Sequence, residues 1–153
     1  YANVAPNEIS GKQYLEMAIK YYNNPNALYI LGKYLIENGR EQNVSKGIKY
    51  LDLAAKQNHA DSLFLLGKFY DIGMFFEQDS KRAMLYFELA AKQESYYYPN
   101  NFSIFENDPF IENISTTKSL CYYYLGIHYL HGDGIDEDLV IAKKIFWKSN
   151  IRR

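Results

Sequence analysis

The sequence repeats a seven-residue segment at a fixed interval, and this feature constrains the fold more than any other. The segment reads Tyr-Leu-Glu-Met-Ala-Ile-Lys from Tyr14, Tyr-Leu-Asp-Leu-Ala-Ala-Lys from Tyr50 and Tyr-Phe-Glu-Leu-Ala-Ala-Lys from Tyr86, so each copy starts 36 residues after the previous one. A repeat of this length is one supersecondary unit, which must stack on its neighbours to bury its apolar face. The sequence therefore predicts a stacked array of repeats.

Capping residues and small residues precede each copy in the same register. The capping position holds Asn7, Asn43, Asp79 and, in a degenerate last copy, Asp138. The small position, four residues later, holds Gly11, Gly47, Ala83 and Ala142. Because Asn and Asp side chains accept from the free N–H groups at the start of a helix, each copy is predicted to be an α-helix capped at this position.

A second helical pattern lies between these copies. It starts with a small residue, which is followed by an aromatic residue two positions after it and by a Leu-Gly pair that begins four positions after it. Its small residues are Ala27, Ser62 and Cys121, and its Leu-Gly pairs begin at Leu31, Leu66 and Leu125. This spacing has the period of a helix, and small residues allow close approach between neighbouring helices. No segment shows the alternation of a strand.

The two patterns together predict an all-α fold, an α-α superhelix (solenoid) of about three and a half helix-turn-helix repeats. The expected parts are a lone second helix over 7–23, repeat one over 26–58, repeat two over 61–93, an insertion over 95–118 and repeat three over 119–150. The array opens on a helix without its partner and closes without a capping helix, and solenoids need polar terminal repeats. We therefore expect the chain to be part of a longer chain or assembly.

The repeated positions resemble the Sel-1-like repeat, a relative of the tetratricopeptide repeat. The third copy, from Cys121 through Ala142, fits the pattern best, whereas the first departs from it at Leu35, Asn38 and Arg40. The resemblance covers nearly the whole chain except the insertion. It implies a non-catalytic α-solenoid scaffold or adaptor for other proteins, with no catalytic residue and no cofactor to carry over.

The residues that could carry chemistry have simpler interpretations. Cys121 occupies the small-residue position, so packing explains it. His128 and His131 are three residues apart and have no evident third ligand or His-Glu-x-x-His spacing. Asp138, in an acidic loop without calcium-loop spacing, is already explained as a cap. We therefore predict no enzyme, no metal or cofactor site and no small-molecule substrate.

The first helix of each repeat has a stripe that repeat packing does not use. It lies at offsets of three, six, seven and ten from the small residue and is about 100° wide. The stripe comprises Ile30, Lys33, Tyr34, Glu37, Leu65, Lys68, Phe69, Ile72, Tyr124, Ile127, His128 and His131. Its apolar and aromatic composition is typical of an interface core. In solenoids of the resembled kind this helix lines the concave surface, so we expect a protein partner there, with packing against neighbouring helices or the insertion as the alternative.

The insertion over 95–118 is a possible second contact. Long loops in compact domains are usually functional or disordered, and disordered segments are poor in aromatic residues. This segment is rich in them, so we expect it to dock on a partner or on the stripe. The possible second contacts are Tyr97, Phe102, Phe105, Phe110 and, in the last helix, Trp147. Trp147 replaces the acidic residue of the earlier copies, which suggests a covered surface.

The charges limit the partners further. A formal net charge of -1 argues against general binding to nucleic acid or membranes. One local basic set, which we expect to be a solvated helix face, comprises Lys143, Lys144, Lys148, Arg152 and Arg153. It supports an alternative function, that of a structural subunit contacting RNA or lipid. The single cysteine favours a reducing compartment such as the cytoplasm but does not exclude the secretory pathway, and no apolar run reaches the roughly 20 residues of a transmembrane helix.

Overall fold

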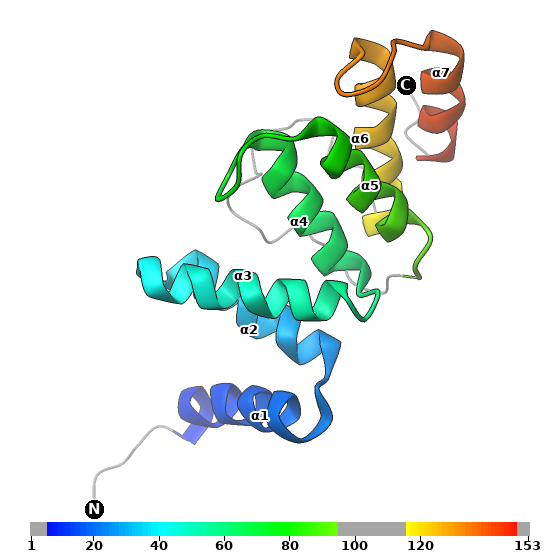
Figure 1. The fold of residues 1–153 in the computed structure, drawn as a ribbon. Coiled ribbons are helices and arrows are strands. Elements are labelled where there is room, and N and C mark those ends of the chain that lie inside the picture. The colour runs from blue at the N-terminus through cyan, green and yellow to red at the C-terminus, as the bar shows by residue number, and fades with distance from the viewer. Residues whose placement is uncertain (1–5, 95–115, 150–153) are drawn as a thin grey trace, which may run out of the picture. The chain divides into compact units, whose positions relative to one another are not determined.

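The computed structural model describes residues 6–94 and 116–149, and within them it contains seven α-helices and no strand (Figure 1). The helices are α1 (Pro6–Tyr22), α2 (Pro25–Asn38), α3 (Glu41–Ala55), α4 (Ala60–Ile72), α5 (Ser80–Ala91), α6 (Thr117–His131) and α7 (Leu139–Lys148). The prediction of an all-α fold is confirmed for this part of the chain. The helices form two compact units, Tyr1–Gln57 with α1 to α3 and Asn58–Arg153 with α4 to α7.

Two of the predicted caps are present in the second unit. The Asp79 carboxylate accepts from the backbone N–H of Arg82 at 2.9 Å, and the Asp138 carboxylate accepts from that of Ile141 at 2.8 Å. The preceding loops turn back at Gly73 and Gly132, whose positive φ values of 69° and 70° are left-handed and favour glycine. These turns end α4 and α6 and leave each aspartate at the start of the next helix.

The predicted caps Asn7 and Asn43 were wrong. Asn7 lies inside α1, and Asn43 lies in the first turn of α3, whose N-cap is Arg40 with no side-chain cap bond. Only Gly39 and Arg40 separate α2 from α3. This short link lets α3 begin at Glu41, whose negative charge suits the start of a helix.

The first helices of the repeats have caps of their own, which the repeat pattern does not reveal. Asn24 Oδ1 accepts from the backbone N–H of Ala27 at 3.1 Å, and Thr116 Oγ1 accepts from that of Ser119, also at 3.1 Å. In α4 the cap is His59, whose Nδ1 accepts from the Ser62 N–H at 3.2 Å. All three side chains satisfy a backbone donor that a helix start leaves free.

Backbone contact between glycines joins α2 to α3 in the first unit. A Cβ atom added to Gly32 would lie 2.9 Å from the carbonyl oxygen of Gly47, and one added to Gly47 would lie 2.6 Å from that of Gly32. Leu28 and Leu51 are fully buried in the same unit. The small-residue positions of the repeat are therefore points where two helices touch.

In the second unit a phenylalanine takes the place of this glycine contact. Phe87 of α5 packs against Gly67 of α4, and Phe146 of α7 packs in the same way against Gly126 of α6. The Phe87 ring also stacks on Tyr124 of α6, with 5.5 Å between ring centroids. Repeats two and three consequently share one apolar core, and α4 is buried from Ala60 to Phe69.

Candidate protein-binding surface

Part of the predicted stripe is exposed on α2. Ile30 and Tyr34 lie one turn apart and are 41% and 53% exposed. Beside them, Lys33 Nζ and Glu37 Oε1 lie 3.9 Å apart, with both side chains largely covered. Burial raises the pKa of Glu37, and the Lys33 charge opposes this effect. The result is an apolar pair flanked by one opposite-charge pair, a composition suited to a protein interface.

A shallow groove of about 220 Å³ lies beside this exposed pair in the first unit. Its lining residues are Lys12, Glu16, Leu31, Tyr34, Leu35, Asn38, Gly39, Asn43 and Lys46, which come from α1, α2, α3 and the link between the last two. Tyr34 thus belongs both to the predicted stripe and to the groove wall. The groove is lined by apolar, amide and charged side chains.

Most of the stripe on α4 is buried. Leu65, Lys68 and Phe69 are at most 6% exposed, and only Ile72 reaches the surface, with 43% exposure. Phe69 packs edge-to-face on Phe75 of the following loop at 5.0 Å between centroids. With the helices packed in this way, Leu65, Lys68 and Phe69 stabilise the unit and are not accessible to a partner.

The stripe on α6 is divided in the same manner. His128 is buried, Tyr124 and Ile127 are half-buried, and His131 is exposed. The structure brings Tyr124 and His128 together with Lys68 of α4, although both follow Lys68 by more than fifty positions in the sequence. What they form is a polar cluster inside the unit.

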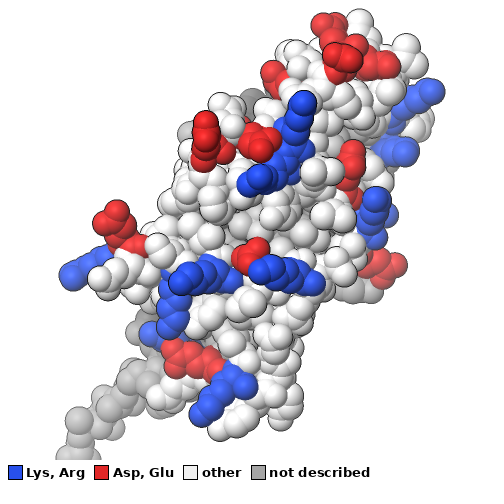
Figure 2. Space-filling view, viewed as in Figure 1, with Lys and Arg blue, Asp and Glu red and all other residues white. Residues whose placement is uncertain are grey.

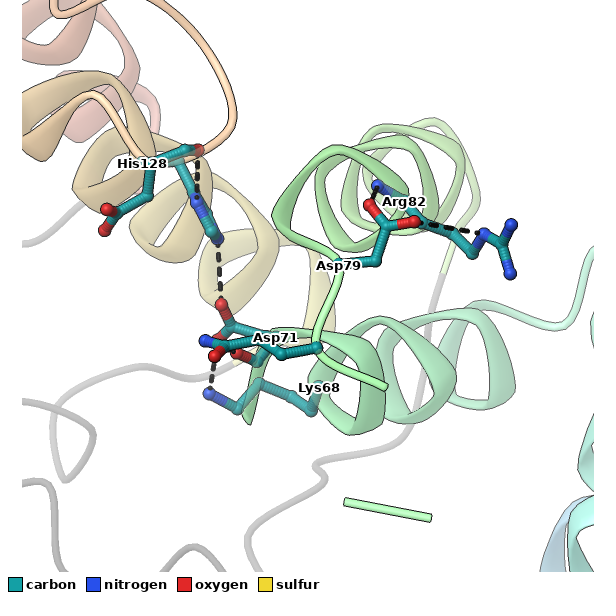
Figure 3. Close-up of polar contacts among 7 residues, drawn as sticks. Lys68, Asp71, Asp79, Arg82 and His128 are labelled. Atoms are coloured by element: carbon teal, nitrogen blue, oxygen red, sulfur yellow. Dashed lines mark hydrogen bonds and ion pairs between the residues drawn. The ribbon is translucent and has the colours of Figure 1, made fainter. Parts of the chain in front are cut away.

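The cluster is built around a carboxylate that the sequence analysis missed (Figure 3). Asp71 Oδ2 accepts from Lys68 Nζ at 3.0 Å, and Asp71 Oδ1 lies 3.0 Å from Nε2 of His128. The Lys68 ammonium also lies 3.8 Å from the centroid of the Tyr124 ring, within the range of a cation–π contact. Asp71 follows Lys68 by three residues, the spacing of an ion pair on one helix face, which is the sequence signal that could have found it.

Both ring nitrogens of His128 face acceptors. Nε2 faces the Asp71 carboxylate, and Nδ1 lies 2.9 Å from the carbonyl oxygen of Asp133 in the loop after α6. A neutral imidazole carries one N–H, whereas the protonated ring carries two. The geometry therefore favours a charged His128 that ties α4, α6 and the following loop together.

Opposing effects set the pKa values within the cluster. Burial alone would lower the pKa of His128, but the hydrogen bond and charge of Asp71, with the Asp133 carbonyl, raise it above its ordinary value. Burial alone would raise the pKa of Asp71, but the bonds and charges of His128 and Lys68 hold it below its ordinary value. Each partner thus favours the charged form of the other.

Cys121, another residue that could carry chemistry, lies in the packed interior of the second unit. Cys121 is fully buried, and burial raises the pKa of its thiol well above the ordinary range. Next to it in the same unit, the Thr117 hydroxyl of α6 donates to the buried Asp61 carboxylate of α4. Among residues 6–94 and 116–149 no three His, Cys, Asp or Glu side chains are placed to hold a metal ion.

A half-buried aromatic column, made of Tyr70, Phe76 and Tyr86, is a second feature that the sequence patterns did not indicate. The Tyr70 ring stacks between Phe76 and Tyr86, at 4.4 and 5.7 Å between centroids, and the Arg82 guanidinium lies 4.9 Å from the Tyr70 centroid. Asp79 pairs with Arg82 at 3.6 Å (Figure 3). A hollow of about 670 Å³ adjoins Tyr70, Phe76 and Arg82.

Basic and acidic side chains are interspersed over the visible face of the molecule (Figure 2).

The possible second contacts fall largely outside the described residues. Tyr97, Phe102, Phe105 and Phe110 lie there, as do Arg152 and Arg153 of the basic set. Trp147 is described and is 87% exposed. Lys143, Lys144 and Lys148 are also exposed, on the same helix α7. In the part of the chain that the structure describes, no helix is both long enough and apolar enough to cross a membrane.

Comparisons with known proteins bear on the fold. A search of curated protein sequences gave no match. Sixteen solved chains match the structure. A Sel1 repeat protein from Oxalobacter formigenes has a TM-score of 0.66 at 23% identity, covering 90% of this chain and 86% of its own. Helicobacter pylori cysteine rich protein B has a TM-score of 0.56 at 22% identity, covering 90% and 87%.

A third solved structure is c5321, a protective antigen present in uropathogenic Escherichia coli strains that displays an SLR fold. Its TM-score is 0.50 at 18% identity, and the match covers 90% of this chain and 32% of that one. Identities this low show a shared fold alone. They confirm the predicted all-α superhelical repeat fold.

The family model of the Sel1 repeat matches residues 25–59, 60–95 and 119–146, which together are more than half of the chain. The first two matches contain the helix pairs α2–α3 and α4–α5, and the third covers most of the pair α6–α7. Proteins with these repeats generally mediate protein–protein interaction and are typically non-catalytic scaffolds. The resemblance seen in the sequence is confirmed, and the chain belongs to the Sel1 repeat family.

Proposed function

We propose that this chain is an adaptor that binds a protein partner through α2, at the exposed part of the stripe and the adjoining groove. The observation that carries the proposal is the pair Ile30 and Tyr34, two large apolar side chains one turn apart that remain exposed beside a groove. Tyrosine is among the residues that contribute most to binding energy at protein interfaces. Family membership supplies the class of function, and these residues supply the surface.

The charges beside the apolar pair help to fix the orientation of a bound partner. Lys33 and Glu37 form an ion pair within the stripe beside Ile30 and Tyr34, and Lys12 and Glu16 form another, also at 3.9 Å, on the groove wall. Charges at the rim of an interface influence register and association rate more than affinity. A partner segment with an apolar anchor and charges of both signs fits this arrangement.

The test is capture of partners from the native source by the full chain and by a double variant. Ile30→Ala with Tyr34→Ala removes the apolar pair, and Tyr22→Ala with Leu53→Ala is a matched control that truncates exposed apolar residues elsewhere in the same unit. We expect the control to retain the proteins captured by the unmodified chain and the stripe variant to lose them. Equal capture by all three proteins would contradict the proposal.

A further inference from the structure

The outward face of α7 is apolar where a helix of this kind should be polar. Leu139, Val140 and Trp147 are 59%, 65% and 87% exposed, and Ala142 is the one buried residue among the ten of the helix. At about 100° per residue, Val140 and Trp147 point some 140–160° away from Ala142. They therefore form an apolar ridge that projects away from the core.

Lysines line both sides of this ridge. On the same helical projection, Lys143 and Lys144 flank Val140 and Trp147 within about 60° on either side. Lys148 completes the basic set at the end of the helix, and its Nζ lies 5.7 Å from the Tyr122 ring centroid. No acidic residue occurs in α7, and among the described residues none of the three lysines forms an ion pair with a carboxylate.

The equivalent face of α5 shows that this ridge is not a surface for stacking repeats. When the caps Asp79 and Asp138 are aligned, Val140 corresponds to Lys81 and Trp147 to Glu88, both of which are exposed. The residue of α5 that stacks on the next helix is Phe87, whose counterpart in α7 is Phe146. A further repeat added after α7 would thus leave the ridge uncovered, so its occupant must be of another kind.

Composition distinguishes between a protein and a lipid occupant. Lysine is depleted in protein–protein interfaces relative to the rest of the surface. Helices that lie on membrane surfaces combine lysines with tryptophan and aliphatic residues, and the tryptophan ring is suited to the headgroup region. The exposed acidic residues Asp136 and Glu137 precede the helix, so they lie at the end of α7 that holds Val140 and not at the end that holds Trp147 and Lys148.

We propose that the outward face of α7 docks peripherally on an anionic lipid surface. Trp147 and Val140 enter the headgroup boundary, and Lys143, Lys144 and Lys148 lie against the lipid charges. This contact is independent of the protein-binding surface on α2, which lies in the other compact unit. A single short helix gives weak, reversible binding that depends on lipid charge and on salt.

The test uses the full chain with vesicles of phosphatidylcholine alone and of phosphatidylcholine mixed with phosphatidylserine. Trp147 is the one tryptophan of the chain, so its fluorescence reports directly on the proposed contact. We expect co-sedimentation with the mixed vesicles, a blue shift of the tryptophan emission, and reversal of both by high salt. Absence of binding, equal binding to neutral vesicles, or binding without an emission shift would overturn the proposal.

Variants locate the contact. Lys143→Glu with Lys144→Glu should weaken partitioning by on the order of 30-fold or more, because each basic residue near an anionic surface contributes about 1 kcal/mol. Trp147→Glu, which restores the acidic residue found at Glu88, should also weaken co-sedimentation. Lys49→Glu with Lys92→Glu changes the net charge equally on other exposed surfaces. If this control weakens vesicle binding as much as the α7 variants do, the proposed site is wrong. Truncation of Ile30 and Tyr34 to alanine should leave vesicle binding unchanged.

Discussion

At the scale of single residues, the cluster around Asp71 shows how one position changes its role with its neighbours. Lys68 and His128 have the sequence positions of a binding stripe, yet both are buried and point toward the same carboxylate. A helical projection treats each helix as if it had one partner on one side. It cannot show that α4 is covered along its first ten residues, because this depends on contacts between helices distant in sequence.

The charge balance of the cluster predicts a large effect for Asp71→Asn. This change removes the carboxylate charge that faces Lys68 and His128 in a mostly buried site, and removing one partner of such a pair costs about 3 kcal/mol of unfolding free energy. Urea denaturation measures the loss. The matched control is Asp52→Asn, which breaks the exposed Asp52–Lys56 pair and should cost less than about 1 kcal/mol. Similar losses in both variants would contradict the account of the cluster.

The same cluster predicts how stability depends on pH. The pKa of His128 is raised above 6.5, so its contribution is complete below pH 6.5 and is lost as pH rises through the folded pKa. The pKa of Asp71 is lowered below 3.8, so its contribution is complete above pH 3.8 and is lost as pH falls through the folded pKa. Both contributions are therefore complete between pH 3.8 and pH 6.5.

The sign of this pH dependence is tested by the unfolding free energies of the unmodified chain and of His128→Gln, measured from pH 3.8 to alkaline pH. Glutamine can donate one hydrogen bond but carries no charge. The stability difference between the two proteins should be largest between pH 3.8 and 6.5 and should shrink toward alkaline pH. A difference that is constant or grows with rising pH would show that His128 is not held in its charged form.

At the scale of helices, the sequence predicts most of what the structure contains. The recurrence of Tyr14, Tyr50 and Tyr86 identifies the second helices, and the family resemblance identifies the pairs, because both depend on local patterns. The caps Asn24, His59 and Thr116 were missed because they differ in residue type from repeat to repeat. Asn43 was misassigned because the two-residue link of repeat one moves the helix start without changing the 36-residue register.

The glycines of the second helices give a matched pair for testing element packing. Gly11 and Gly47 hold the same position in the repeat, but a Cβ on Gly11 meets nothing within 4 Å, whereas one on Gly47 meets the Gly32 carbonyl oxygen at 2.6 Å. Gly11→Ala should therefore raise the unfolding free energy by about 0.5–1 kcal/mol through helix propensity. Gly47→Ala should lower it by about 1–3 kcal/mol because the helices must separate. Thermal melts of both variants check that the two changes in unfolding free energy have opposite signs.

At the scale of the whole molecule, the chain combines an ordinary repeat core with surfaces that differ between its units. The first unit exposes apolar stripe residues on α2, while the second buries the equivalent residues of α4. The second unit instead exposes the ridge of α7. The same repeat positions are thus buried in one repeat and exposed in another.

The central claim is that the exposed stripe of α2 is the protein-binding surface, and the affinity of a captured partner tests it most directly. The dissociation constant should be measured by calorimetry for the unmodified chain, for Ile30→Ala with Tyr34→Ala, and for Tyr22→Ala with Leu53→Ala. We predict that the stripe variant binds about 30-fold more weakly or worse, since anchor residues contribute roughly 2 kcal/mol or more, and that the control binds as the unmodified chain does. A stripe variant that is folded by circular dichroism and binds with unchanged affinity would contradict the claim.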